Sequence, residues 1–304
     1  MPATISVMNT GAFAQLISRD FNNVFFDNYT RQDTEYDKIA NVSTMDGAYI
    51  REGQMAGLSA LQQIGEGEPV AYDSFVPGNE KTVLPSDFAL GLAITRNMYD
   101  DDRTGYMKRG FAELGKAAAY TRELLFADVL NSGFVTTKRV GIDGAALFAS
   151  HTLLGGGTYS NYASTGSSLS MTTLQAACDN FEALPNERGI PLKMKPKLLI
   201  VPYQLRWIAE KLVKNEYNPE NANNERNYEQ IRGLQFVVNH YLSSSTAWFL
   251  AGDKSDHDLR FIWRKQLQLQ STDDFDTRTA KFMAVMRLQT TFFGWRGVYG
   301  NAGA

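Results

Sequence analysis

The sequence predicts an α+β protein of two lobes, with the second lobe inserted into the first. The chain has 304 residues, which is more than one compact core usually serves. A long helical pattern, 104–131, precedes a region of alternating short helices and strands that begins at Ser170. A strand-like run from Asp276 returns the chain to the first lobe, and a lobe bracketed in this way is an insertion.

The composition is that of a folded protein, with 43% hydrophobic and 21% charged residues. The net charge of −3 argues against a protein that wraps nucleic acid, because such proteins need a basic surface. The single cysteine, Cys178, can form no internal disulfide, so we expect a reducing, cytoplasmic origin. The N-terminus has no basic start followed by an apolar core, and no window approaches 18 uninterrupted apolar residues. We therefore expect neither a signal peptide nor a membrane span.

Residues 1–45 are predicted to form an N-terminal arm. Phe13, Leu16 and Ile17 lie at helical spacing, and aromatic residues such as Phe21 and Phe25 follow. An apolar, aromatic segment of this kind must pack on the chain's own body or on a neighbouring molecule.

Residues 46–95 are predicted to form an extended two-stranded loop with its base strands. The strand candidates 48–52 and 70–76 flank a segment rich in Gly, Gln and Glu. From Phe88 to Ile94 large apolar residues alternate with Ala and Gly, which indicates a strand packed closely on one face. A two-stranded arm alone in water is marginally stable, so we expect it to lie on another subunit.

The remaining chain divides into a helical segment, an inserted lobe and a tail. Within 96–169, residues 104–131 carry an apolar stripe at three- and four-residue steps, with Thr104 as the expected cap. The lobe 170–275 should contain helices after Ser170 and from Leu205 to Val213, with Ile208 facing inward. It should also contain the strands 196–202, 234–239, 247–251 and 261–269. The tail 276–304 is the return strand.

Clusters of titratable residues give no convincing catalytic, cofactor or metal site. Asp100, Asp101 and Asp102 precede the long helix, where acidic residues favour the helix dipole more often than they bind a cation. His257 lies between Asp256 and Asp258, but adjacent side chains of an extended backbone diverge, so an exposed turn is expected.

Other sequence signals also have simple structural explanations. The segment 155–158 lacks the Lys of a phosphate-binding loop and is read as a turn, and Ser150-His151 has no nucleophile-elbow pattern. Cys178 lies on an apolar helix face, where a buried, inert thiol is expected. The four tryptophans, Trp207 among them, are expected to be core or interface anchors.

The order of these segments resembles the major capsid proteins of tailed phages, the Hong Kong 97 type, over roughly 270 residues. PKLLIVPYQLRWIAEKLV, residues 196–213, is similar to the strand and helix that open the axial domain of that family. GAALFASH, residues 144–151, and the turn 155–161 resemble the major head subunit of Mu-like phages. The tail, with Phe282, Arg287 and Gly294-Trp295, resembles the closing strand of the family.

The resemblance implies the phage major capsid fold, with an N-terminal arm, an extended loop, a peripheral domain with a long spine helix, and an inserted axial α+β domain. It implies a structural head protein that assembles into pentamers and hexamers and forms the icosahedral shell around phage DNA. It places the protein in the virion, assembled in the host cytoplasm. The implied partners are further copies, a scaffolding protein, a portal and a cement protein, with no specific DNA binding and no membrane.

Interface positions follow from the same resemblance. The residues expected to contact neighbouring subunits lie on the arm, on the extended loop and in the polar 215–227 segment: Phe13, Phe21, Phe25, Tyr49, Arg51, Tyr72, Phe75, Asn218 and Asn223. The resemblance also implies a possible Lys–Asn crosslink, as in the type member, with Lys81 at the base of the loop as its lysine. No residue pattern marks an asparagine partner, so a solvated turn lysine is expected.

Two other functions remain open from the sequence. An encapsulin-like shell protein would have the same fold and the same assembly physics. A cytosolic hydrolase would use carboxylates such as Asp253 and Asp256 and would need a concave pocket with shifted pKa values.

Overall fold

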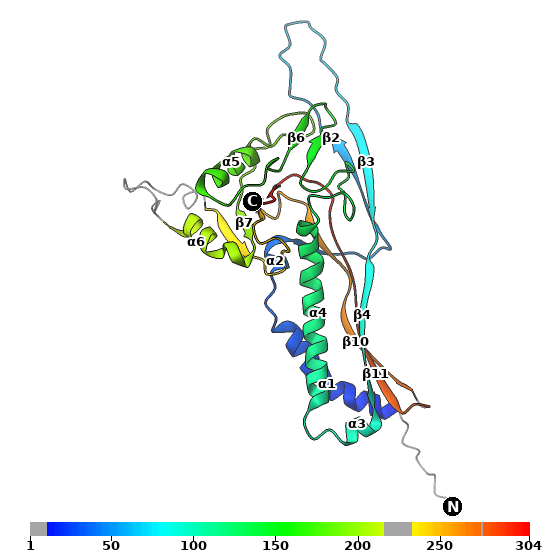
Figure 1. Cartoon of the computed structure of the whole chain (residues 1–304). Helices are drawn as coiled ribbons and strands as arrows, with labels where there is room; N and C mark the ends of the chain where they lie inside the picture. Colours follow the sequence, from blue (N-terminus) through cyan, green and yellow to red (C-terminus); the bar gives the residue numbers. More distant parts are fainter. Residues whose placement is uncertain (1–10, 216–232, 275) are drawn as a thin grey trace, which may run out of the picture.

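A computed structural model describes residues 11–215, 233–274 and 276–304. Figure 1 shows an elongated subunit in which a long sheet and a long helix run side by side, a second lobe lies to one side, and a loop projects from one end. This arrangement has the α+β character that the sequence predicts.

The first sheet has four strands in the order β1-β10-β11-β4. Its strands are β1 (Asn41–Thr44), β10 (Leu259–Asp274), β11 (Thr279–Phe292) and β4 (Ser86–Thr95). β11 pairs antiparallel with both β10 and β4, and Phe282 lies opposite Leu92 in the latter pair. The alternation predicted around residues 88–94 is confirmed at Phe88, Leu92 and Ile94, which pack on the hydrophobic clusters. It is wrong at Leu90, which is 55% exposed.

Two helices cover one face of this sheet. They are α1 (Gly11–Thr30) and the spine helix α4 (Tyr106–Asn131). The predicted apolar stripe of α4 is buried, with Phe111 packed edge-on against Phe282 at 4.9 Å between ring centroids. The expected cap is corrected from Thr104 to Asp102, whose carboxylate accepts hydrogen bonds from the backbone amides of Tyr106 and Met107, each at 3.0 Å.

The second sheet has the order β12-β9-β7-β8. Its strands are β7 (Leu198–Val201), β8 (Gln235–Val238), β9 (Trp248–Ala251) and β12 (Val298–Asn301). The helices α5 (Met171–Glu182) and α6 (Arg206–Lys214) pack on one face through Leu174, Phe181 and Val213. The other face contributes Ile200 and Phe249 to the cluster that also contains the end of α4, so the two lobes share a core.

Strand pairing corrects two predictions. The predicted strand 261–269 belongs to β10 in the first sheet and not to the inserted lobe, because β10 pairs with β11 along most of its length. The predicted strands 48–52 and 70–76 are displaced to β2 (Ile50–Ala56) and β3 (Val76–Val83), which pair antiparallel. Most of segment 70–76 has no regular strand partner.

Short elements complete the chain. They are α2 (Tyr36–Ile39), α3 (Arg96–Asp100), β5 (Ser150–Thr152), β6 (Thr158–Ser160) and the 3₁₀ turn Tyr203–Leu205. The glycine run 155–157 is the turn of the β5–β6 hairpin, as expected. Within the described residues, no helix combines the length and the apolar character that a membrane crossing requires.

Candidate assembly surfaces

The most exposed feature of the subunit is the extended loop beyond β2 and β3. Residues 57–75 leave the body of the molecule (Figure 1) and lack regular secondary structure apart from one turn. Leu61 and Tyr72 are 101% and 97% exposed. Other large apolar side chains of this loop are also exposed: Leu58, Ile64, Val70 and Phe75. A run of uncovered apolar side chains marks an interaction site.

One arginine of the second lobe holds both sides of the loop. The Arg188 guanidinium donates hydrogen bonds to the backbone carbonyls of Gly57 and Ser74, each at 3.0 Å, and pairs with Asp73 at 3.2 Å. Asp73 also accepts a hydrogen bond from the Ser59 hydroxyl across the loop, and the bonds from Ser59 and Ser74 lower the pKa of Asp73 to about 2. The neck of the loop is therefore closed and fixed to the body.

The residue before Arg188 forms a second tether. The Glu187 carboxylate accepts hydrogen bonds from the Gln54 side chain on β2 and from Arg296 in the tail, each at 2.6 Å. It also accepts the Leu154 amide at 3.0 Å. These contacts join the base of the loop to three separate segments of the subunit, so the direction of the loop is set by the body.

Four of the sequence-predicted interface residues lie together on this element. Tyr49, Tyr72 and Phe75 are exposed, and Arg51 forms an exposed ion pair with Glu80 on the opposite strand. The structure therefore brings these four onto one projecting unit, and their contact with a neighbouring subunit stays a prediction.

The arm differs from the expectation. Phe25 is fully buried within the subunit core, and the Phe21 ring stacks on Phe111 at 4.8 Å. The prediction that Phe25 contacts a neighbour is therefore wrong, and Phe21 is largely used within the chain. The reason is a close helix crossing: a Cβ built on Gly115 of α4 would lie 2.4 Å from the Phe25 carbonyl oxygen. Phe13 lies in α1 but its side chain is outside the described residues, as are Asn218 and Asn223.

A further exposed aromatic surface lies on helix α6 of the second lobe, where the sequence predicts that Ile208 packs inward. Trp207 is 74% exposed, and Tyr203 and Ile208 beside it are also exposed, which corrects the inward placement of Ile208. Ala209 and Val213 form the buried stripe of α6. The spacing of Ala209 and Val213 was the signal that Ile208 lies at the edge of this stripe.

Lys81 is not the solvated lysine that its position suggested. Its ammonium group donates a hydrogen bond to the Thr291 hydroxyl at 2.9 Å and lies 4.9 Å from the centre of the Phe292 ring. Burial, together with the nearby Arg139 charge, lowers the pKa of Lys81 to about 8. Lys81 therefore anchors the base of the loop to the end of β11.

The histidines are structural in their contacts. His151 is buried, its Nδ1 lies 2.5 Å from Asp143, and its ring stacks on Trp295 at 4.2 Å between centroids. His257 is buried, not exposed as expected, and burial lowers its pKa. Its neighbour Asp258 turns away to Arg260. Within the described residues, His, Cys, Asp and Glu form no group of three or more that could hold a metal ion.

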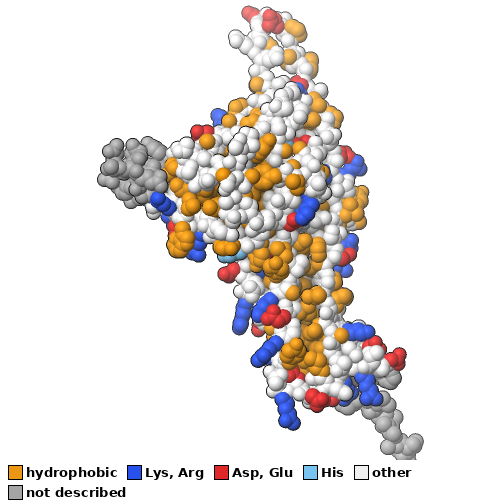
Figure 2. Space-filling view, viewed as in Figure 1, with side chains coloured by type: hydrophobic (Ala, Val, Ile, Leu, Met, Phe, Trp, Pro, Cys, Tyr) orange, Lys and Arg blue, Asp and Glu red, His pale blue; other side chains and the backbone are white. Residues whose placement is uncertain are grey.

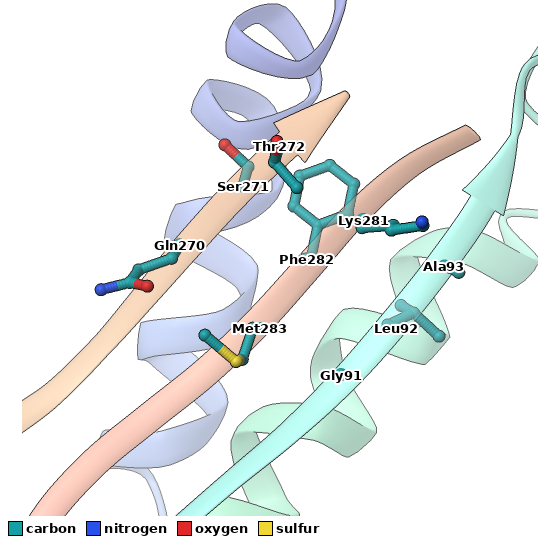
Figure 3. A pocket seen from close by; sticks show the side chains of 9 residues that line it. All are labelled: Gly91, Leu92, Ala93, Gln270, Ser271, Thr272, Lys281, Phe282 and Met283. Atoms are coloured by element: carbon teal, nitrogen blue, oxygen red, sulfur yellow. The ribbon is translucent and has the colours of Figure 1, made fainter. Parts of the chain in front are cut away.

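A shallow cavity of about 430 Å³ lies at the far end of the first sheet (Figure 3). It is lined by residues of three strands: Gly91, Leu92, Ala93, Gln270, Ser271, Thr272, Lys281, Phe282 and Met283. The charged side chain among them, Lys281, is paired with Asp274 at 3.0 Å. The lining is mainly apolar and small, so it suits packing against another surface better than acid–base chemistry.

Comparison with known structures identifies this architecture. The chain is similar to a structure of Microbacterium phage Oxtober96 (TM-score 0.57, 10% identity), with 90% of this chain and 92% of that chain covered. It is similar to the bacteriophage JBD30 capsid (TM-score 0.57, 18% identity), with 78% and 100% covered. It is also similar to a virus-like particle from Pyrococcus furiosus (TM-score 0.52, 9% identity), with 93% and 98% covered.

These structural likenesses establish the phage capsid fold, which the resemblance in the sequence implied. A comparison with curated proteins gives no match. Residues 79–301, from the third strand to the last, match the family described as phage capsid protein. The chain belongs to the phage capsid protein family.

Proposed function

We propose that this chain is the major head subunit of a Mu-like tailed phage and that it assembles through its extended loop into pentamers and hexamers. As a member of the phage capsid family, it is a structural protein of the shell and belongs to the virion. The observation that carries the proposal is the loop 57–75, whose apolar side chains are uncovered in the subunit although the neck is firmly held.

The physical argument concerns what could cover this surface. A projecting two-stranded arm is marginal in water, and each large apolar side chain gains roughly 1.5–3 kcal/mol on full burial. The subunit's own body holds the neck of the loop through Arg188 but does not cover its tip (Figure 1). Repeated copies in a closed symmetric array provide the same partner surface to every loop.

The Mu-like assignment is supported by how the resembling segments meet. The segment 144–151 provides Leu147, Phe148 and His151, all buried, and the tail provides Trp295. His151 and Trp295 stack in parallel, so the segment that resembles the Mu-like head subunit contacts the tail that resembles the closing strand of the family. We propose a scaffolding protein, a portal and a cement protein as further partners, and enclosure of double-stranded DNA without specific binding.

We also propose the domain division of that fold for this chain: arm 1–45, extended loop 46–95, peripheral domain 96–169, axial domain 170–275 and return strand 276–304. The course of β10 supports one refinement, because this strand pairs with the return strand and would count with the peripheral domain.

The test is a deletion that spares the neck. Residues 58–72 are replaced by a short Gly-Ser turn, which keeps Gly57, Asp73 and the Arg188 contacts. We expect a folded chain with a near-wild-type melting temperature that forms no shells, while the wild-type chain forms regular particles in negative-stain images. Regular particles from the deletion variant would contradict the proposal.

A further inference from the structure

The extended loop carries only one sign of charge. Residues 57–75 include Glu66, Glu68 and Asp73 but no Lys or Arg. Asp73 is already held by Ser59 and Arg188 at the neck. Glu66 is exposed and has no hydrogen-bonding or ionic partner among the described residues, and Glu68 reaches only the amide of Gly65 within the same turn, at 3.0 Å. The tip therefore presents two carboxylates, and Figure 2 shows acidic side chains there.

A cleft elsewhere on the subunit carries the opposite charge. Its volume is about 600 Å³, and it lies where β3 passes into β4, beside the ends of α4 and β11. Three cationic side chains line it, namely Lys81, Lys138 and Arg139, against a single carboxylate, Asp128, among its lining residues.

Among the residues that line the cleft, one carboxylate faces three cations. Asp128 pairs with Lys138 at 2.7 Å and with Arg139 at 2.5 Å, so it is shared between two of them. Lys81 donates hydrogen bonds to neutral groups, the Thr291 hydroxyl and the Phe292 carbonyl. The carboxylates of Asp143 and Asp258 also act on its charge, but each is paired elsewhere, with His151 and with Arg260. The Lys138 side chain is 59% exposed, so it is accessible to an incoming anion.

We propose that the acidic loop tip of one copy, Glu66 and Glu68, binds in the cleft of a second copy formed by Lys81, Lys138 and Arg139. This inference rests on the proposed self-assembly and names its docking site. An incoming carboxylate adds a second anionic partner for the three cations that line the cleft. Complementary charge of this kind sets the register and the partner of an interface more than its raw affinity.

The contact must be between copies, because a loop cannot reach the cleft of its own subunit. Lys81 lies on β3, whose pairing with β2 runs from Val83 opposite Ile50 to Val76 opposite Ala56. The Arg188 contacts continue this rigid connection to the neck. The tip consequently projects beyond β2 and β3 and away from the body (Figure 1).

Apolar side chains accompany the charges on both sides. Leu61 and Ile64 are exposed close to the acidic tip. Val83, Leu84 and Val140 line the cleft, and Leu84 is 62% exposed at its rim. A cleft lined by both apolar and cationic side chains fits an acidic segment that carries exposed Leu and Ile.

A second basic cavity provides a matched control. Its volume is about 240 Å³, and it is lined by Lys38, Lys197 and Lys254 with Asp253 as its acidic residue. Here Lys197 pairs with Asp253, and Lys254 donates to the Asp37 carbonyl. The charge pattern is similar, but the cavity is smaller and lies by the second lobe, so the inference assigns it no role in binding the tip.

The experiment is a charge swap on the full chain. We expect Glu66→Lys/Glu68→Lys and, separately, Lys138→Glu to remain folded and monomeric, and to raise the protein concentration needed for shell formation about tenfold or more. The chain that combines Glu66→Lys/Glu68→Lys with Lys138→Glu should recover to within about threefold of wild type. The control chain, which combines the tip variant with Lys254→Glu, should not recover.

The outcomes separate the two claims. Light scattering and electron microscopy measure shell formation by each chain, and melting temperatures verify that each chain is folded. Wild-type shells together with a tip variant that assembles normally, or a Lys254→Glu chain that rescues equally well, would overturn the docking site and leave the capsid function intact. A wild-type chain that never assembles would contradict the proposed self-assembly and the docking site with it.

Discussion

Glu123, in the middle of the spine helix, accepts a hydrogen bond from the backbone amide of Tyr36 at 3.0 Å. The carboxylate is buried, and its second neighbour is the equally buried Arg122, whose Nε lies 3.7 Å from Glu123 Oε1. The contact ties the end of the N-terminal arm to α4. Burial outweighs these partners and raises the pKa of Glu123 to about 7.

Because of the Glu123 carboxyl, we expect the free energy of unfolding to decrease as the pH rises. The unfolded chain releases the proton near its ordinary pKa of 4.5, whereas the folded chain holds it to about 7. The protonated carboxyl therefore favours the folded state below pH 4.5, and that advantage is lost as the pH rises from 4.5 to 7. One pKa unit corresponds to about 1.4 kcal/mol, so the loss is roughly 2–4 kcal/mol.

The test compares the wild type with Glu123→Gln. Denaturant unfolding between pH 5 and 8 should show a smaller pH dependence in the variant, because glutamine keeps an acceptor for the Tyr36 amide but does not ionise. Glu113→Gln serves as the control, since Glu113 lies exposed on the same helix beside Lys116. Parallel curves for wild type and Glu123→Gln would show that another group controls the pH dependence.

We expect a single methyl group added at Gly115 to destabilise the subunit. The Phe25 carbonyl oxygen lies 2.4 Å from the position of an added Cβ, and backbone cannot move as a side-chain tip can. We expect Gly115→Ala to lower the free energy of unfolding by about 1–3 kcal/mol.

Gly110 on the same helix is its matched control. An added Cβ there meets the tip of the Leu92 side chain at 3.3 Å. Alanine also gains about 1 kcal/mol in helix propensity, so the net change for Gly110→Ala should stay within about 1 kcal/mol. Urea unfolding measures the free energy of unfolding of both variants. Equal changes in the two would contradict the close helix crossing at Gly115.

We expect the substitution of Arg188 to make the extended loop less ordered while the subunit stays folded. Arg188→Ala removes both carbonyl contacts and the Asp73 pair at the neck. Because the loop packs little on the body, the free energy of unfolding should change by no more than about 1 kcal/mol. Hydrogen exchange of β2 and β3 should rise, and particles should become irregular in size. Arg188→Lys should show an intermediate effect, since an ammonium cannot reach both strands as a planar fork does.

We expect replacement by alanine to destabilise the subunit at Trp295 but not at Trp207. Trp295 is buried in the stack with His151, so Trp295→Ala should destabilise the subunit by about 3–5 kcal/mol. Trp207 is exposed on α6, and Trp207→Ala should change the free energy of unfolding by no more than about 0.5 kcal/mol. Thermal unfolding of the two variants makes the comparison, and a large effect at Trp207 would mean that it is packed within the subunit.

Periodicity was sufficient to predict the elements whose burial follows their own sequence. Phe111, Leu114 and Ala118 recur at helical spacing and are buried in α4. The large–small alternation from Phe88 to Ile94 predicted the strand β4 and the packing of its large residues apart from Leu90, which is exposed. The exposure of residues 57–75 could be predicted from their composition, because their apolar residues keep no helical or strand spacing along the whole segment that would form one apolar face.

The tertiary structure decided where the elements pack, because partners distant in the chain determine it. Phe25 reads as an interface aromatic until the crossing at Gly115 buries it, and 261–269 reads as part of the inserted lobe until β11 pairs with it. His151 and Trp295 are 144 residues apart in the chain (295 − 151), yet their rings stack. Local spacing fixes which face of an element is apolar, and only the folded chain fixes which surface covers that face.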